Sequence, residues 1–293
     1  ELRRSGQDLM IFNQFDEFGN YLWHYEVTGH AMQELLEHVM GPHDVYRGMA
    51  SATGSAGTIA SGDYMKQIFP GSKIAASEAL QCPTLLENGF GAHRIEGIGD
   101  KHVPWIHNVK NTDLVVAIDD EAVVALARLF NEPVGQAYLA KMGVPEVVIG
   151  QLDLLGFSGI SNVLTAIKMA KYYEMGEQDI VLTILTDSME LYESRIGEMH
   201  EQYGDYSERD AAAHYARYLL GQGVDNLREL TYPERRRVQN LKYFTWVEQQ
   251  GKTFDEIRSQ WYDTEYWTRV QHLTPEIDAL IEEFNAEAGL AAK

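Results

Sequence analysis

The sequence has 293 residues and little of several features that mark particular classes of protein. It has one cysteine, Cys82, so no disulfide can form within the chain, and a single thiol among ten methionines is typical of a reducing compartment such as the cytoplasm. No apolar run approaches the roughly 20 residues that cross a bilayer. The first residues also lack the apolar stretch of a secretory signal. We therefore expect a cytoplasmic protein and no membrane partner.

Positive charge is also scarce. The chain has 24 lysines and arginines against 44 acidic residues, a formal net charge of −20. This charge repels nucleic acid, and no basic stripe along the sequence offsets it. The one cationic run, Arg235-Arg236-Arg237, stands where a helix begins and is expected to form a solvated helix face. We therefore expect no nucleic-acid partner.

Candidates for metal binding or nucleophilic catalysis are few. His102 and His107 are five positions apart in a loop-like segment, and no carboxylate stands at ligand spacing on a helix. We expect polar structural roles for these histidines and no metal site. Cys82 precedes a proline and is expected to be a small buried residue rather than a nucleophile. No Ser-His-Asp arrangement of the hydrolase type is visible.

The first two thirds of the chain alternate between strand-like and helical patterns. Hydrophobic residues make up 45% of the chain, enough for a sizeable core. We predict strands at residues 9–12, 45–51, 73–77, 114–118 and 180–185, and helices at 24–39, 58–69, 121–130 and 160–173. This alternation is typical of an α/β protein with a mostly parallel sheet and helices on both faces.

Strand signals stop at about residue 190, and helical patterns follow one another at 190–203, 208–220, 234–250, 255–260 and 275–288. Ser207 and Thr274 stand where helix N-caps are expected. We therefore predict a large α/β domain at residues 1–194 and a C-terminal all-helical extension at residues 195–293. The extension is rich in aromatic residues at 243–246 and 261–267, where we expect helix packing or a dimer interface, with a substrate lid as the alternative.

The most informative stretch is Ser-Ala-Thr-Gly-Ser-Ala-Gly-Thr at residues 51–58, which follows a predicted strand and opens a predicted helix. Small residues let the backbone approach a ligand closely, and successive amides at a helix N-terminus form an anion site. The stretch lacks the Gly-Lys-Ser/Thr ending of a P-loop and the Gly-x-Gly-x-x-Gly of dinucleotide-binding proteins. It predicts a phosphate monoester held without a metal. The alternative is a tight strand-to-helix turn that holds no ligand.

Seven segments, in the same order and at similar spacing, resemble the cysteine synthases, which are pyridoxal-phosphate enzymes of fold type II. Residues 24–29, His-Tyr-Glu-Val-Thr-Gly, resemble their His-x-Glu-Thr-Thr-Gly segment. Residues 53–58 resemble their Gly-Thr-Gly-Gly-Thr phosphate cup. The other matching segments are residues 73–78 (Lys-Ile-Ala-Ala-Ser-Glu), 93–99 (His-Arg-Ile-Glu-Gly-Ile-Gly), 113–127, 156–159 (Gly-Phe-Ser-Gly) and 185–192 (Leu-Thr-Asp-Ser-Met-Glu-Leu-Tyr).

This resemblance implies the fold type II architecture and pyridoxal 5'-phosphate as cofactor. It implies that Gly97, Ile98 and Gly99 line the substrate side and that residues 186–188 meet the pyridine nitrogen. The implied activity is β-replacement or β-elimination on a small amino acid, by a transferase or lyase of amino-acid metabolism that forms a homodimer. The implied phosphate-binding residues are Thr53, Gly54, Ser55, Ala56, Gly57 and Thr58.

The chain departs from the family in its lysines. In the family, the Schiff-base lysine and the substrate-carboxylate loop lie upstream of the segment that matches Phe15. No lysine here has the surroundings expected of that residue, and Lys101, the one nearest the predicted site, is not expected to replace it. We therefore expect no catalytic residue in this chain. The expected partner is a missing N-terminal half, in the same chain or a separate one.

A second departure is Asp187, which stands where cysteine synthases have a serine. A carboxylate there would pair with a protonated pyridinium and strengthen the ring as an electron sink. Alternatively, Asp187 caps the helix that follows, or a one-residue shift of the match places Thr186 or Ser188 at the nitrogen. Replacement and elimination both remain open. The alternative function is a non-catalytic scaffold or regulatory subunit that keeps the fold without the lysine.

Overall fold

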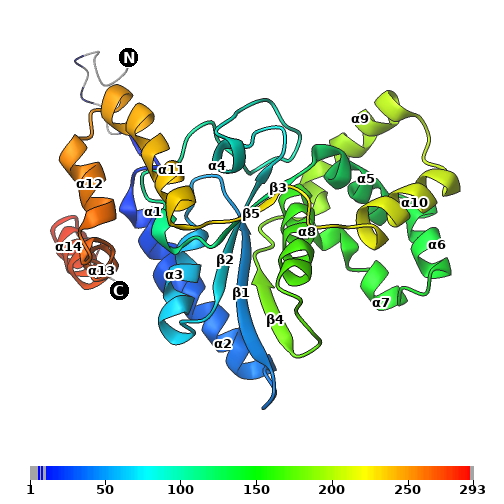
Figure 1. Ribbon diagram of the computed structural model, residues 1–293, viewed down its shortest axis with the longest axis horizontal. Coiled ribbons are helices and arrows are strands. Elements are labelled where there is room, and N and C mark those ends of the chain that lie inside the picture. Colours follow the sequence, from blue (N-terminus) through cyan, green and yellow to red (C-terminus); the bar gives the residue numbers. More distant parts are fainter. Residues whose placement is uncertain (1–5, 7, 9–10, 291–293) are drawn as a thin grey trace.

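The computed structural model describes residue 6, residue 8 and residues 11–290. At its centre is a five-stranded sheet in the order β4-β1-β2-β3-β5, with helices on both faces (Figure 1). The pairs β4-β1, β1-β2 and β2-β3 are parallel, whereas β5 runs antiparallel to β3. The strands are β1 (Val45–Ala52), β2 (Lys73–Ala79), β3 (Leu114–Ile118), β4 (Asp179–Thr183) and β5 (Leu227–Glu229). The mostly parallel sheet predicted from the sequence is confirmed.

The interior strand β3 shows why the sheet is covered on both sides. All five of its residues are buried, and successive side chains of a strand point to opposite faces. Leu114, Val116 and Ile118 belong to one apolar core, with residues of α5 and α8. Val115 and Ala117 belong to a second core, with residues of α3. A continuous apolar run is therefore the pattern expected of a strand between two helix layers.

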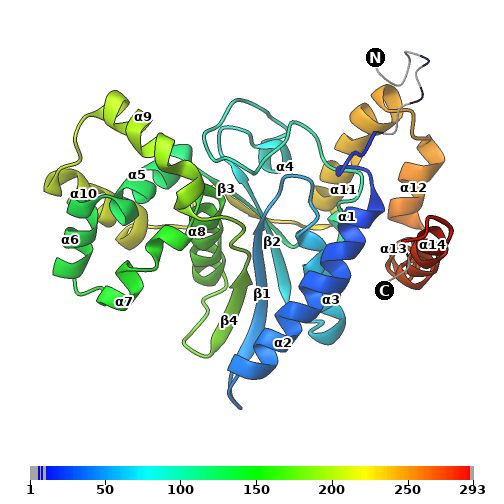
Figure 2. The ribbon, with the colours of Figure 1, turned by 180° about the vertical axis from the view of Figure 1, so that it is seen from behind.

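One face of the sheet is covered by α1 (Phe18–Trp23), the π-helix η2 (His24–Thr28), α2 (Gly29–Val39) and α3 (Ile59–Ile68), and the other by α5 (Asp120–Asn131) and α8 (Phe157–Tyr172), as Figures 1 and 2 show from opposite sides. Short elements complete the first part of the chain. They are α4 (Thr84–Glu87), the 3-10 helices η3 (Val109–Asn111) and η4 (Leu152–Leu154), α6 (Pro133–Lys141) and α7 (Glu146–Ile149).

The C-terminal helices form two groups on opposite sides of the sheet, outside the helices that cover its faces (Figure 1). The 3-10 helix η5 (Met189–Tyr192), α9 (Glu193–Tyr203), α10 (Glu208–Tyr215) and the π-helix η6 (Ala216–Leu220) lie beside α5 and α6. The chain then crosses the sheet edge through β5. Beyond it, next to α1, lie α11 (Tyr232–Lys242), the π-helix η7 (Tyr243–Gln249), α12 (Phe254–Tyr262), α13 (Tyr266–Gln271) and α14 (Thr274–Glu287).

Three local predictions need correction. Residues 195–293 are not purely helical, because they include β5, a strand too short to produce an alternating pattern in the sequence. Of the strand predicted at residues 9–12, residues 9–10 lie outside the described residues, and residues 11–12 form no strand. Ser207 caps α10 with a reciprocal hydrogen bond to Asp210, as predicted. Thr274, in contrast, lies inside α14, and its hydroxyl has no hydrogen-bond partner among the described residues.

Two features are absent from the described residues. None of the helices there combines the length and the apolar character that a membrane crossing requires. Likewise, no group of three or more histidine, cysteine, aspartate or glutamate side chains in this part of the chain is arranged to hold a metal ion.

Candidate functional site

A cavity of about 420 Å³ opens at the carboxyl ends of β1 and β4. Ser51 and Ala52, the last residues of β1, line it from one side, and Ile184, directly after β4, lines it from the other. The sheet order reverses here, since the chain proceeds from β1 to β2 and β3 in one direction while β4 lies on the opposite side of β1. In open α/β sheets, ligands bind in the crevice at such a reversal. The fold itself therefore marks this cavity as the candidate site.

The loop from Gly54 to Thr58 lines the cavity between β1 and α3. In the part of the chain that the structure describes, its five consecutive backbone amides donate no hydrogen bond to any acceptor. The first amides of a helix have no partner within the helix, and the helix dipole favours an anion at this end. Ala56 has a φ of 64°, a turn that brings successive amides to one side. The loop is therefore built to accept a negatively charged group.

Side chains of the neighbouring elements hold this loop in place. The hydroxyls of Thr58 and Ser51 are 2.6 Å apart, and Asn20 of α1 donates from Nδ2 to the Ser55 hydroxyl at 3.0 Å. Gly57 allows α1 and η2 to approach, because a Cβ at this position would lie 2.7 Å from Cδ2 of His24. The loop therefore needs small residues on two sides, where it faces the cavity and where it packs against α1 and η2.

A second wall, next to this loop, is formed by Gly97, Ile98 and Gly99, the residues predicted for the substrate side. Both glycines have a φ of 78°, which disfavours any other residue. The amide of Gly99 donates to the carbonyl of Thr53 at 2.7 Å, which ties this wall directly to the end of β1. The structure therefore brings the two predicted segments together although more than 35 residues separate them in sequence.

Thr53 differs from the sequence-based expectation. Its amide and its hydroxyl both donate to the carbonyl of Ser77, at 2.8 Å and 3.2 Å, and it is not one of the residues that line the cavity. The side chain is buried between the ends of β1 and β2. Thr53 therefore supports the loop from behind, and its predicted place among the ligand-binding residues has to be corrected.

At the far end of the cavity lie Thr186 and Ser158, whose hydroxyls are 3.1 Å apart. Asp187 is behind them and does not line the cavity itself. Its carboxylate accepts hydrogen bonds from the Tyr192 hydroxyl, from Ser158 at 3.4 Å and from Thr186 at 3.5 Å. Burial and the nearby carboxylate raise the pKa of Tyr192, so its hydroxyl stays protonated and donates. Asp187 caps no helix, because η5 begins after Ser188 without a side-chain cap.

Several lining residues were not predicted from the sequence. Asn162 of α8 accepts from the amide of Ala52 and donates to the carbonyl of Ile184, both at 2.7 Å, and so joins the ends of β1 and β4. The sheet-facing side of α8 also carries Ser161 and Thr165, which bond the Ser77 hydroxyl of β2, so the residue type alone did not single out Asn162. Gln14 lies in a turn with no repeating pattern, so the sequence carried no signal for it either.

The cavity attracts an anion through backbone dipoles rather than through charged side chains. Its lining, among the described residues, contains no lysine or arginine. His24 lines it, but burial lowers the pKa of this histidine, so it is neutral at pH 7. The helices α3 and α8 both begin at the cavity, and the dipole of each helix favours negative charge at its N-terminus.

This chain is similar in sequence and in fold to known proteins. No family model matches the sequence. Cysteine synthase B of Campylobacter jejuni is 27% identical over 193 residues, which cover 66% of this chain and 56% of the relative. A cysteine synthase of Staphylococcus aureus is 25% identical over 180 residues, covering 61% of this chain and 50% of the relative. The crystal structure of cysteine synthase from Entamoeba histolytica superposes with a TM-score of 0.53 at 19% identity, over 73% of this chain and 56% of that one.

These findings confirm the resemblance to cysteine synthases and the fold type II architecture. The solved structure, at 19% identity, shows the fold alone. The chain spans about half the length of the curated relatives it matches.

Proposed function

We propose that this chain, which is cysteine synthase-like in sequence and fold, binds pyridoxal 5'-phosphate in the cavity between β1 and β4. The observation that carries the proposal is the row of five amides, from Gly54 to Thr58, that line the cavity without an acceptor in the described residues. A phosphate monoester offers three oxygen acceptors to such a row. The cavity of about 420 Å³ is also of the size that small-molecule sites have.

The hydroxyls of Ser55 and Thr58 would add donors to the phosphate, beside the amides of Gly54, Ala56 and Gly57. At the far end, the ring nitrogen would meet the Thr186 hydroxyl, with Asp187 one hydrogen bond behind it. A hydroxyl that donates to a carboxylate presents its lone pairs outward and becomes a better acceptor for a protonated nitrogen. In this arrangement Asp187 acts on the ring through Thr186 rather than by direct contact.

The substrate would be a small amino acid held against Gly97, Ile98 and Gly99. When bound, pyridoxal phosphate withdraws electrons from the α-carbon of an amino acid, which permits β-replacement or β-elimination. The described lining contains no lysine, and Lys101 is not part of it. We propose that the catalytic lysine belongs to an N-terminal half, in the same chain or a separate one. We further propose a homodimer that works in the cytoplasm as a transferase or lyase of amino-acid metabolism.

For the domain organisation, we propose that residues 1–194 form the cofactor-binding part and residues 195–293 an extension that completes it. Through β5 the extension adds a strand to the sheet, and Met199, Tyr206 and Ala211 enter one of the apolar cores. The two parts would therefore unfold together rather than independently.

The proposal is tested by titrating the chain with pyridoxine 5'-phosphate and with pyridoxine, which differ only in the phosphate. Neither carries the aldehyde, so neither reacts with surface lysines. We expect pyridoxine to bind at least about 100-fold more weakly, because it loses two or more charge-assisted hydrogen bonds of about 1.5–3 kcal/mol each. Inorganic phosphate should compete with pyridoxine 5'-phosphate. Equal affinities for the two compounds would contradict the proposal.

A second candidate function is a non-catalytic scaffold or regulatory subunit, which the lack of a lysine in the described lining favours. The two candidates are separated by supplying the upstream reading frame, or a companion chain, together with pyridoxal 5'-phosphate. Visible absorbance of a lysine-bound cofactor supports the enzyme. Its absence, with the cofactor bound, supports the scaffold.

A further inference from the structure

The segment between β2 and β3 (residues 80–113, the β2–β3 segment) has little regular structure although it carries one wall of the cavity. It contains only the single-turn α4 and the three-residue η3. Most of its backbone carbonyls therefore have no partner in a helix or a sheet, and buried carbonyls need one. Long irregular segments of this kind are uncommon inside compact domains unless they serve a function. Gly97 to Gly99 lie at its middle.

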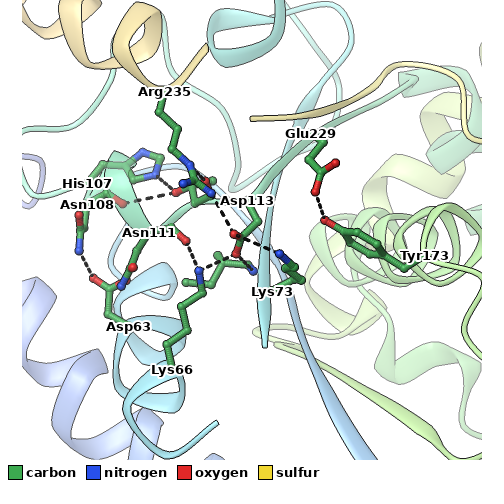
Figure 3. A network of polar contacts seen from close by, with 12 residues as sticks. Asp63, Lys66, Lys73, His107, Asn108, Asn111, Asp113, Tyr173, Glu229 and Arg235 are labelled. Atoms are coloured by element: carbon green, nitrogen blue, oxygen red, sulfur yellow. Dashed lines mark hydrogen bonds and ion pairs between the residues drawn. The ribbon is translucent and has the colours of Figure 1, made fainter. Parts of the chain in front are cut away.

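The missing partners come from the C-terminal extension. Its side chains donate to six carbonyls of the β2–β3 segment, two before Gly97 and four after Gly99. These bonds run from Arg237 to Leu85 (2.6 Å), Arg228 to Leu86 (2.6 Å), Trp246 to Val103 (2.8 Å), Lys242 to Trp105 (2.9 Å) and His107 (2.7 Å), and Arg235 to Thr112 (2.8 Å). Figure 3 shows Arg235 reaching from α11 to Asp113 at the end of this segment.

The first end of the segment is held from two sides. The carboxylate of Glu78 accepts from the amides of Leu85 and Leu86 at 2.8 Å each, while the two arginines bind the carbonyls of the same residues. These contacts continue toward the cavity. The hydroxyl of Thr84, the residue before Leu85, donates to the carbonyl of Asp100 at 2.6 Å. Asp100 follows Gly99.

The second end is held in the protein interior. Lys242 is 0% exposed and Trp246 is 1% exposed, so their hydrogen bonds to the carbonyls of Val103, Trp105 and His107 are shielded from water. The Nζ of Lys242 also donates to Oε1 of Gln260 at 2.8 Å. Trp105 in turn donates its amide to the carbonyl of Phe15, which lines the cavity. Both ends of the segment are thus fixed by residues that follow position 227.

We propose that the C-terminal extension is a clamp that positions Gly97 to Gly99 against the phosphate loop, with Arg228, Arg237, Lys242 and Trp246 as positioning residues. None of the four lines the cavity, so they act on a ligand only through the β2–β3 segment. The inference deepens the proposed function, because the wall that they position is the substrate side of that site. It also assigns to the extension a role other than that of a lid.

The test compares Arg228→Met/Arg237→Met with a matched control, Arg236→Met. Arg236 lies on the same helix as Arg237, but it contacts the Tyr262 hydroxyl and the Trp261 ring instead of the β2–β3 segment. Hydrogen exchange is measured on the full chain without ligand, at the Gly99 amide and in β1, β2 and β3. We expect the Gly99 amide to exchange at least about 10-fold faster in the double variant, with the strands unchanged, and the control to match wild type.

Affinity for pyridoxine 5'-phosphate is measured on the same three proteins and should fall only in the double variant. Unchanged Gly99 exchange in a folded double variant would overturn the clamp, as would an equal acceleration in the strands. If the double variant does not fold, Trp246→Phe removes only the indole donor to Val103 and is judged by the same criteria. Should wild type bind no pyridoxine 5'-phosphate while the exchange result holds, the cofactor proposal fails and the clamp stands.

Discussion

Replacing Gly57 by alanine perturbs the candidate site where its loop packs against α1 and η2. The added Cβ would lie 2.7 Å from Cδ2 of His24 and nearer still to the amide oxygen of Asn20, whereas side-chain carbons essentially never come within 3.0 Å of such atoms. Asn20 also donates to the Ser55 hydroxyl at 3.0 Å, so a shift of Asn20 moves the loop. Overpacking of this kind costs about 1–3 kcal/mol in the free energy of unfolding.

The same change disturbs the amides of Gly57 and Thr58. Loss of one charge-assisted hydrogen bond to phosphate, worth about 1.5–3 kcal/mol, weakens binding by roughly 10- to 100-fold. Isothermal titration with inorganic phosphate and with pyridoxine 5'-phosphate measures this loss, and urea unfolding measures the stability. Gly71→Ala is the matched control, since a Cβ there meets nothing within 4 Å.

The reasoning is refuted if Gly57→Ala loses the expected stability and still binds both ligands as tightly as wild type. Such a protein would have filled the space beside the loop without affecting the ligand. Equal loss of affinity in Gly71→Ala would be a refutation as well, because that glycine lies in the turn between α3 and β2, away from the cavity.

Three further predictions concern stability. Burial raises the pKa of Glu78 in the folded protein to about 7 from 4.5. The contribution of this carboxyl group to the free energy of unfolding is therefore full below pH 4.5 and is lost as the pH rises through 7. Between pH 5.5 and 8.5 wild type should therefore lose about 2 kcal/mol relative to the permanently neutral Glu78→Gln in urea unfolding, and a constant difference would contradict this. Asp113→Ala should cost about 3–5 kcal/mol, because the carboxylate is buried against Lys66 at 2.6 Å and Arg235 at 2.9 Å (Figure 3). The surface ion pair of Asp263 with Arg269 provides the control, since Asp263→Ala should lower the free energy of unfolding by under about 1 kcal/mol. Inorganic phosphate at 100 times its Kd should raise the free energy of unfolding by about 2.7 kcal/mol, and no rise would mean that the folded chain has no phosphate site.

The parts of the fold that could be predicted are those fixed by local patterns. The strand β3 is a continuous apolar run, Leu-Val-Val-Ala-Ile, because helices cover both of its faces, and burial of this kind can be read directly from the sequence. The loop at residues 54–58 was also predictable as the connection between a strand and a helix, since small residues in succession separate the two patterns, whereas anion binding at this loop stays a prediction. β5 was not predictable, because its three residues are a strand only through their pairing with β3.

Side-chain direction within the site was beyond the reach of the sequence. Thr53 was expected in the anion site because it begins the matching motif, but its orientation is set by the carbonyl of Ser77 on the neighbouring strand. For Asp187, pairing with the ring nitrogen, helix capping and a one-residue shift to Thr186 or Ser188 were all open from the sequence, and its carboxylate is held by hydrogen bonds from Tyr192, Ser158 and Thr186. Contacts between segments far apart in the chain decide both cases. The proposed clamp likewise depends on such contacts, and no sequence motif predicts it.

The most direct test of the account follows the backbone amides themselves. An isotope-labelled chain is titrated with pyridoxine 5'-phosphate while the amide resonances are recorded by NMR. We predict that the amide protons of Gly54 to Thr58 shift downfield more than all others, follow a single dissociation constant, and do not move with pyridoxine. If these five resonances remain in place while the ligand binds, or if the shifts concentrate at another helix N-terminus, the phosphate site is elsewhere and the account is wrong.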